Sequence, residues 1–189
     1  ETAGTVPAIA YGPGTPEYNL SNYGLFLGRP ITGMRVFDLR CATDFLAARD
    51  EVDPQRLSIC GRGRGAFTGI LAAAFDERIG NVAAEELLST WVFNDEFVNI
   101  GLAYLIPRIL TLGDMPQWLA CLAPRPLLVL NPVDGRRRPI DHAAARRTNR
   151  FAQSIYTLHD AAPRLQPQST DPQEAVPALV EWHQTHVAP

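Results

Sequence analysis

The chain has 189 residues, 46% of them hydrophobic, and a formal net charge of −3. This length and composition predict one globular domain with a sizeable core and exclude a disordered linker protein. The small negative charge gives no electrostatic footprint for nucleic acid, and no apolar run approaches the ~20 residues that a membrane span needs. We therefore expect a soluble protein that binds neither nucleic acid nor a membrane.

The first fifty residues predict no strand. Residues 1–32 are rich in Gly, Pro, Tyr and Asn and predict a loop-rich lead-in. From Gly33 to Asp50, apolar residues recur at helical spacing and predict a helix. The opening Glu1-Thr2-Ala3-Gly4 lacks the charged and apolar regions of a signal peptide. The start therefore resembles the middle of a longer protein, which leaves export as part of that protein open.

From residue 57 onward, short apolar runs alternate with helical patterns. This alternation predicts a mostly parallel sheet flanked by helices, the α/β class. The first run needs a neighbouring strand that the sequence does not clearly provide, so we expect another segment to cover its edge. The predicted strands are Leu57–Cys60, Val82–Leu87, Leu127–Leu130 and Arg164–Gln168, and the predicted helices are Ala66–Phe75, Leu119–Leu122, Pro139–Tyr156 and Pro172–His186.

Three cysteines, Cys41, Cys60 and Cys121, are widely spaced and predict buried free thiols. No Cys/His spacing typical of a metal site appears, so the sequence predicts neither a metal nor a cofactor.

The stretch L-S-I-C-G-R-G-R-G-A-F, residues 57–67, carries the strongest functional signal. A strand, a glycine turn and a helix are the layout of the nucleophile elbow, G-x-S-x-G, but Gly63 stands where that motif has its serine. A glycine has no side chain with which to attack a carbonyl carbon. Cys60 lies three residues before the apex and is interpreted as a core thiol.

The same turn has two other interpretations. Gly61, Gly63 and Ala66 also match a dinucleotide-type G-x-G-x-x-A, with Glu85 at the spacing of a ribose-binding acid. Because helix N-termini favour anions, Arg62, Gly63, Arg64 and Gly65 are candidate anion-binding residues. A tight turn without any ligand is the third interpretation.

Several motifs in order resemble bacterial α/β-hydrolases of the acetyl xylan esterase and dienelactone hydrolase type. The resemblance implies a single α/β-hydrolase-like domain over residues 1–189 that lacks the N-terminal strands, with residues 91–118 where relatives carry a cap over the pocket. It implies as partner the missing N-terminal half of the fold, a neighbouring domain or a homodimer mate. The motifs are Y-N-L at 18–20, L-G-R-P-I-T-G-M-R-V-F-D-L at 27–39, E-V-D-P-Q-R-L-S-I at 51–59, A-A-A-F-D-E-R-I at 72–79 and P-R-P-L-L-V-L-N at 124–131.

The resemblance also assigns the three positions of a catalytic triad. The nucleophile position falls on Gly63 and is vacant, and the acid position falls on Asp134, which is equally an ordinary turn residue. The histidine position falls at residues 168–171, where the sequence is Q-S-T-D. Of the four histidines elsewhere, His159 is the substitute base that a modest register shift would bring nearest the strand ends.

With two of three triad positions vacated, we expect a catalytically degenerate homologue with a structural or binding role, taking a carbohydrate or a small ester as ligand. Two alternatives stay open. One is an active esterase whose nucleophile or base comes from another chain or domain, and the other is an anion- or nucleotide-binding module that uses residues 61–66.

Overall fold

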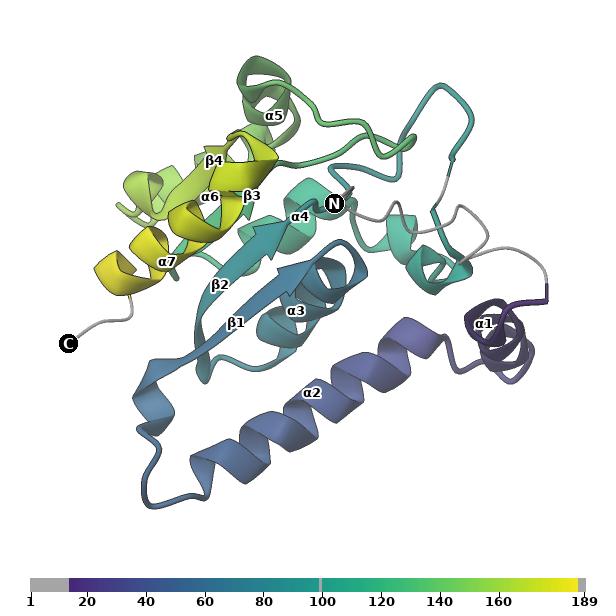
Figure 1. Ribbon diagram of the computed structural model, residues 1–189, viewed down its shortest axis with the longest axis horizontal. Helices are drawn as coiled ribbons and strands as arrows, with labels where there is room; N and C mark the ends of the chain where they lie inside the picture. The colour runs from purple at the N-terminus through teal and green to yellow at the C-terminus, as the bar shows by residue number, and fades with distance from the viewer. Residues whose placement is uncertain (1–13, 99, 187–189) are drawn as a thin grey trace, which may run out of the picture.

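Four strands alternate with helices in the computed structural model, which describes residues 14–98 and 100–186 (Figure 1). Short 3-10 turns connect several of these elements. The elements are α1 (Pro16–Phe26), α2 (Ile31–Ala47), β1 (Leu57–Arg62), α3 (Arg64–Phe75), β2 (Ile79–Glu85), α4 (Met115–Ala120), β3 (Leu127–Leu130), α5 (His142–Thr148), α6 (Arg150–Leu158), β4 (Leu165–Gln168) and α7 (Ala175–His186).

The strands form one parallel sheet in the order β1-β2-β3-β4. One row across it joins Ile59, Val82, Leu127 and Leu165. All four residues of β3 are buried, as expected for a strand with neighbours on both sides and helices on both faces. The α/β class and the parallel sheet predicted from the sequence are confirmed.

Helices cover the two faces of the sheet unequally. A large core cluster joins α2, α3, α4 and α6 to one face, where Val82, Leu127 and Val129 point inward. On the other face, a small cluster joins Trp182 of α7 to Leu128 and neighbouring residues. Of the described helices, α7 is the one that packs on this second face (Figure 1). Part of the second face, over β1, is therefore left without a helix in the described residues.

Two helix predictions were wrong. Residues 16–26, predicted as loop, form α1, whose start is capped because the Thr15 side chain accepts a hydrogen bond from the Tyr18 N–H. The predicted helix Pro139–Tyr156 is divided at Asn149 into α5 and α6. The predictions for residues 1–13 lie outside the described residues.

The prediction of buried cysteines was also wrong, since Cys41, Cys60 and Cys121 are all exposed free thiols. Helix α2 buries the face that carries Val36 and Thr43, and Cys41 lies off that face. Cys60 is exposed because it lies on the face of β1 that no described helix covers, where burial alternates along the strand.

Candidate active-site region

The turn between β1 and α3 has the geometry of an elbow. Gly63, at its apex, has φ +56° and ψ −113°, a backbone conformation that favours glycine. Its N–H donates to the Glu85 carbonyl oxygen at 2.8 Å and its carbonyl oxygen accepts from the Phe67 N–H at 3.0 Å. A Cβ added at Gly61 would lie 2.5 Å from the carbonyl carbon of Gly65, so glycine is required there too. The chain therefore turns sharply between strand and helix.

A guanidinium and a phenol face this apex. A Cβ built on Gly63 would lie 3.7 Å from Arg137 Nη1 and 3.7 Å from the Tyr104 hydroxyl oxygen. The Tyr104 ring is stacked on Phe67 of α3, with ring centroids 5.4 Å apart. Any side chain at position 63 would thus project toward Arg137 and Tyr104.

Glu86 holds Arg137 in this place. Its carboxylate accepts hydrogen bonds from Arg62 Nη2 at 2.5 Å and from Arg137 Nη2 at 2.9 Å. Glu86 and Arg137 both have a left-handed backbone, with φ +50° and +59°, a conformation that costs a non-glycine residue about 1–3 kcal/mol. The hydrogen bond to Glu86 raises the pKa of Arg62 above its ordinary value. The sequence does not predict that these three side chains meet, because Arg62 ends β1, Glu86 follows β2 and Arg137 lies in the loop after β3.

The candidate anion-binding residues lie on the elbow, and both arginines are in ion pairs. Arg62 pairs with Glu86 and approaches Glu85 at 3.8 Å. Arg64 pairs with Glu17 of α1. An anion at Gly63 or Gly65 would have to compete with these carboxylates for the two guanidinium groups.

Asp134, the predicted acid, closes its own turn after β3. One carboxylate oxygen accepts from the N–H groups of Arg136 and Arg138 at 2.8 and 2.9 Å, and the other accepts from Arg138 Nε at 2.8 Å. Partial burial opposes its charge, but the hydrogen bonds from Arg138 and Arg136 outweigh that effect and lower the pKa of Asp134 below its ordinary value. The Asp134 side chain therefore stabilises the turn after β3, as an ordinary turn residue does.

The structure does not bring His159 to Gly63. His159 ends α6, shortly before the start of β4, whereas Gly63 follows the end of β1. Because the strands are parallel, the start of one strand and the end of another lie at opposite ends of the sheet, measured along the strand direction. His159 and the elbow are thus separated by the length of the strands.

The loop after β4, where the resemblance implies a histidine, is fastened to the loop after β3. The Thr170 N–H donates to the side-chain oxygen of Asn131 at 2.8 Å. Asp171 then accepts from the Gln173 N–H at 3.0 Å and begins the turn that leads into α7. This loop serves as a structural link in the described residues.

Cys60 is not an activated thiol. Partial burial of its sulfur, with a smaller contribution from the charge of Glu85, raises the pKa of Cys60. A raised pKa lowers the thiolate fraction at neutral pH, and the thiolate is the nucleophile. The described residues also contain no cluster of three metal-ligating side chains.

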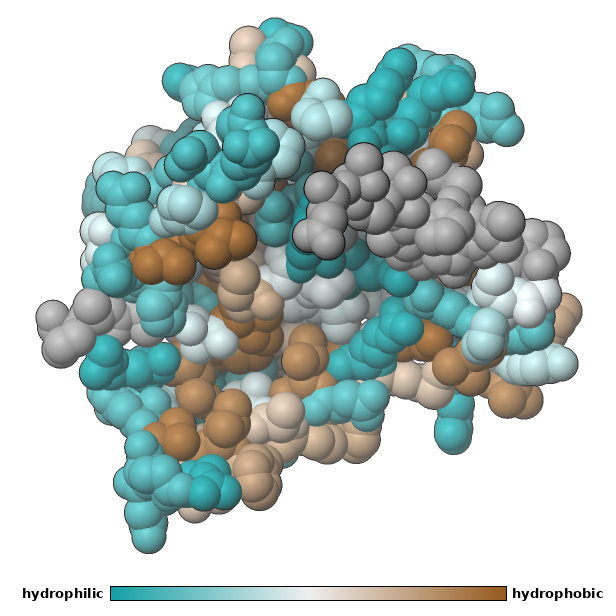
Figure 2. All heavy atoms as spheres, in the orientation of Figure 1, coloured by the Kyte–Doolittle hydropathy of each residue, from teal (hydrophilic) through white to brown (hydrophobic). Residues whose placement is uncertain are grey.

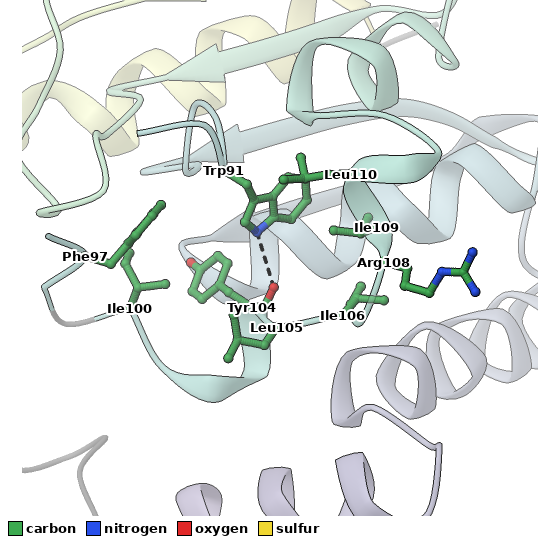
Figure 3. A pocket seen from close by; sticks show the side chains of 9 residues that line it. All are labelled: Trp91, Phe97, Ile100, Tyr104, Leu105, Ile106, Arg108, Ile109 and Leu110. Carbon is green, nitrogen blue, oxygen red and sulfur yellow. Dashed lines mark hydrogen bonds between the residues drawn. The ribbon is translucent and has the colours of Figure 1, made fainter. Parts of the chain in front are cut away.

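An apolar cavity of about 450 Å³ lies beside the elbow in the 91–118 segment (Figure 3). Tyr104 connects the cavity with the elbow, since Tyr104 lines the cavity and its hydroxyl faces Gly63. The indole N–H of Trp91 donates to the Tyr104 carbonyl oxygen at 3.3 Å and holds the two residues together. The cavity is lined by Trp91, Phe97, Ile100, Tyr104, Leu105, Ile106, Arg108, Ile109 and Leu110.

No described helix is both long enough and apolar enough to cross a bilayer.

Comparison with known proteins identifies the fold. No family model matches the sequence. A Bacillus subtilis protein named as a hydrolase, YtaP, is 24% identical over 131 residues, which are 68% of this chain and 44% of that protein. The chain thus spans less than half the length of this curated relative.

Solved structures of esterases share the architecture. A Bacteroides fragilis protein described as an acetyl xylan esterase superposes with a TM-score of 0.67 and 16% identity, over 86% of this chain and 43% of that one. A CE15 glucuronoyl esterase from Teredinibacter turnerae gives 0.58 and 16%, over 79% of this chain and 45% of that one. The four-stranded parallel sheet and its helices therefore have an α/β-hydrolase-like fold, of the kind found in acetyl xylan and CE15 esterases.

Proposed function

We propose that this chain is a catalytically silent member of the esterase-like α/β-hydrolases and serves a structural or binding role. The observation that carries the proposal is the apex of the elbow. The backbone bends there as it does around a catalytic serine, but Gly63 offers no nucleophile, and Arg137 and Tyr104 stand next to it.

The energetics of serine hydrolases support this proposal. Loss of the nucleophile alone costs on the order of 10⁶ in turnover, and what remains comes from the oxyanion hole and substrate binding. No imidazole is among the three atoms nearest to the Gly63 Cβ position, two of which belong to Arg137 and one to Tyr104. The lack of an imidazole among these nearest atoms, together with the glycine at the apex, supports the proposal.

The apolar cavity beside the apex supports a binding role. Its aromatic walls suit the flat, apolar face of a sugar ring or the acyl part of a small ester. Neighbours in the comparison are named for esters of xylan and of glucuronic acid. We therefore take an ester-bearing carbohydrate as the ligand class of the proposal.

Hydrolysis of p-nitrophenyl acetate tests the loss of catalysis. The purified chain should release nitrophenol no faster than buffer, while an active acetyl esterase in the same buffer serves as the positive control. Turnover above the blank that disappears in Asp134→Ala or His159→Ala would overturn the proposal.

The alternative of an active site completed by another polypeptide has its own signature. Serine-directed fluorophosphonate would then label an assembly that contains this chain, although the chain alone is not labelled.

A further inference from the structure

Three arginines lie together where α5 meets α6, on the β4 side of the sheet and away from β1 (Figure 1). Arg146 and Arg147 belong to the last turn of α5, and Arg150 begins α6. Asn149, which joins the two helices, has φ −86° and ψ 11°. Like charges three and four residues apart on a helical segment repel one another, and none of the three arginines pairs with another described residue. The cluster therefore carries positive charge that the described part of the chain does not balance.

A groove of about 420 Å³ runs along this cluster. Polar side chains of α6 and the edge strand β4 complete its lining, through Gln153, Ser154, Thr157 and Pro167. A proline in an edge strand offers no N–H to a further strand, so this groove is not a template for a β-strand. Its volume lies in the range of small-molecule sites, about 300–1,000 Å³. Since one water molecule takes about 30 Å³, a bare ion would leave most of the groove to solvent. Elsewhere on the surface, Figure 2 shows hydrophobic side chains between α7 and α2, which contrast with the polar lining of this groove.

The most buried residue of the groove lacks a hydrogen-bond partner. Asn149 lines the groove and is only 4% exposed. Its buried Oδ1 accepts no hydrogen bond from a described residue, and its side chain does not cap α6. Buried polar side chains in native proteins are normally hydrogen-bonded, because an unsatisfied one costs stability. A ligand that brings a hydroxyl group into the groove supplies the missing donor.

We propose that the arginine groove, defined as the groove lined by Arg146, Arg147, Asn149 and Arg150, binds an anionic sugar, that is, a sugar with a carboxylate or a phosphate group. The groove lies beside β4, whereas the elbow follows β1 at the other edge of the sheet. This site is therefore separate from the elbow and its apolar cavity, and it does not depend on the loss of catalysis.

Each feature of the arginine groove matches one part of such a ligand. The anionic group pairs with the guanidinium groups, whose planar fork of donors suits carboxylate and phosphate alike. A sugar hydroxyl donates to Asn149 Oδ1, and the sugar ring occupies the volume that a bare ion leaves empty. Because the arginines are exposed, salt screens their charge and a small anion alone gains little there. The ligand thus needs both its charge and its hydroxylated ring.

The test titrates glucose 6-phosphate and glucuronate separately into the full chain labelled with ¹⁵N, so that the two anions are distinguished. At least one of them should shift the amide signals of Asn149 and Arg150, and neutral glucose and inorganic phosphate should each bind about tenfold more weakly than that ligand. Arg150→Gln should weaken binding about tenfold. Arg40→Gln makes the same charge change at an exposed position of α2 and should bind like the wild type. Asn149→Ala should reduce the affinity for the sugar to that for the bare anion without lowering the Tm, because its side chain makes no hydrogen bond with a described residue.

The proposal is overturned if neither sugar shifts these signals up to about 10 mM, or if the bare anion binds as tightly as its sugar. It is also overturned if Arg150→Gln binds as tightly as Arg40→Gln. Should a variant not fold, the wild type decides the question, because its affinity should fall several-fold between about 50 and 300 mM NaCl, and an affinity that does not change with salt overturns the proposal. None of these outcomes affects the assay with p-nitrophenyl acetate, so the two proposals fail separately.

Discussion

The elbow makes opposite predictions for two glycines that lie two residues apart. Gly63→Ala meets no atom closer than 3.7 Å, so its cost comes from the backbone at φ +56° and ψ −113°, about 1–3 kcal/mol. Gly65→Ala has open space around the new Cβ and lies in the first turn of α3. It should stabilise the fold by about 0.5–1 kcal/mol, because alanine loses less backbone entropy than glycine.

The two variants should therefore differ in stability by about 3 kcal/mol, which for a domain of this size corresponds to a difference in Tm of about 6–12 °C. Thermal unfolding followed by circular dichroism measures it. Gly61→Ala, whose Cβ would meet the backbone of Gly65 at 2.5 Å, should be the least stable of the three. A Gly63→Ala protein that is as stable as the wild type, or more stable than Gly65→Ala, would refute the elbow geometry.

Three further predictions concern charge. Glu86→Gln removes a partly exposed carboxylate from two arginines and should cost about 1 kcal/mol in urea unfolding at low salt; an equal cost in ~1 M NaCl would contradict an ionic origin. The Asp76 carboxylate, buried and hydrogen-bonded by Arg78, has its pKa lowered from the ordinary 3.8. Its contribution to stability is present above pH ~4 and is lost as the pH falls through the lower folded value, so Asp76→Asn should flatten the acid limb of a pH–stability curve. Because Arg62 and Arg64 are already ion-paired, inorganic phosphate should leave the Tm unchanged, and a rise would favour the anion-binding interpretation instead.

Strand β3 was the most predictable part of the sheet because it is a continuous short apolar run. Leu127–Leu130 was placed without error, since a strand buried on both faces needs four consecutive apolar residues. Helix α1 was missed because it buries only Ser21 and Gly24 among its residues, and so carries no apolar periodicity. The signal that was present is its start, where Thr15 precedes Pro16 and Glu17 in the order typical of a helix N-terminus.

The site was predictable in its backbone and not in its surroundings. The glycine spacing gave the strand–turn–helix bend and the vacant apex, because both follow from local sequence. The approach of Tyr104 and Arg137 to that apex, with Glu86 paired to Arg137, depends on the long connection between β2 and α4, on the loop after β3, and on left-handed backbone at Glu86 and Arg137. Neither a contact between distant loops nor a left-handed backbone at a non-glycine residue produces a periodicity or a spacing that can be recognised in the sequence.

Intact-mass spectrometry after treatment with a fluorophosphonate tests the absence of a nucleophile most directly. The chain alone should keep its unmodified mass, while an active serine esterase in the same tube gains one phosphonyl group. A phosphonyl adduct on this chain, at any residue and accompanied by ester turnover, would contradict the account.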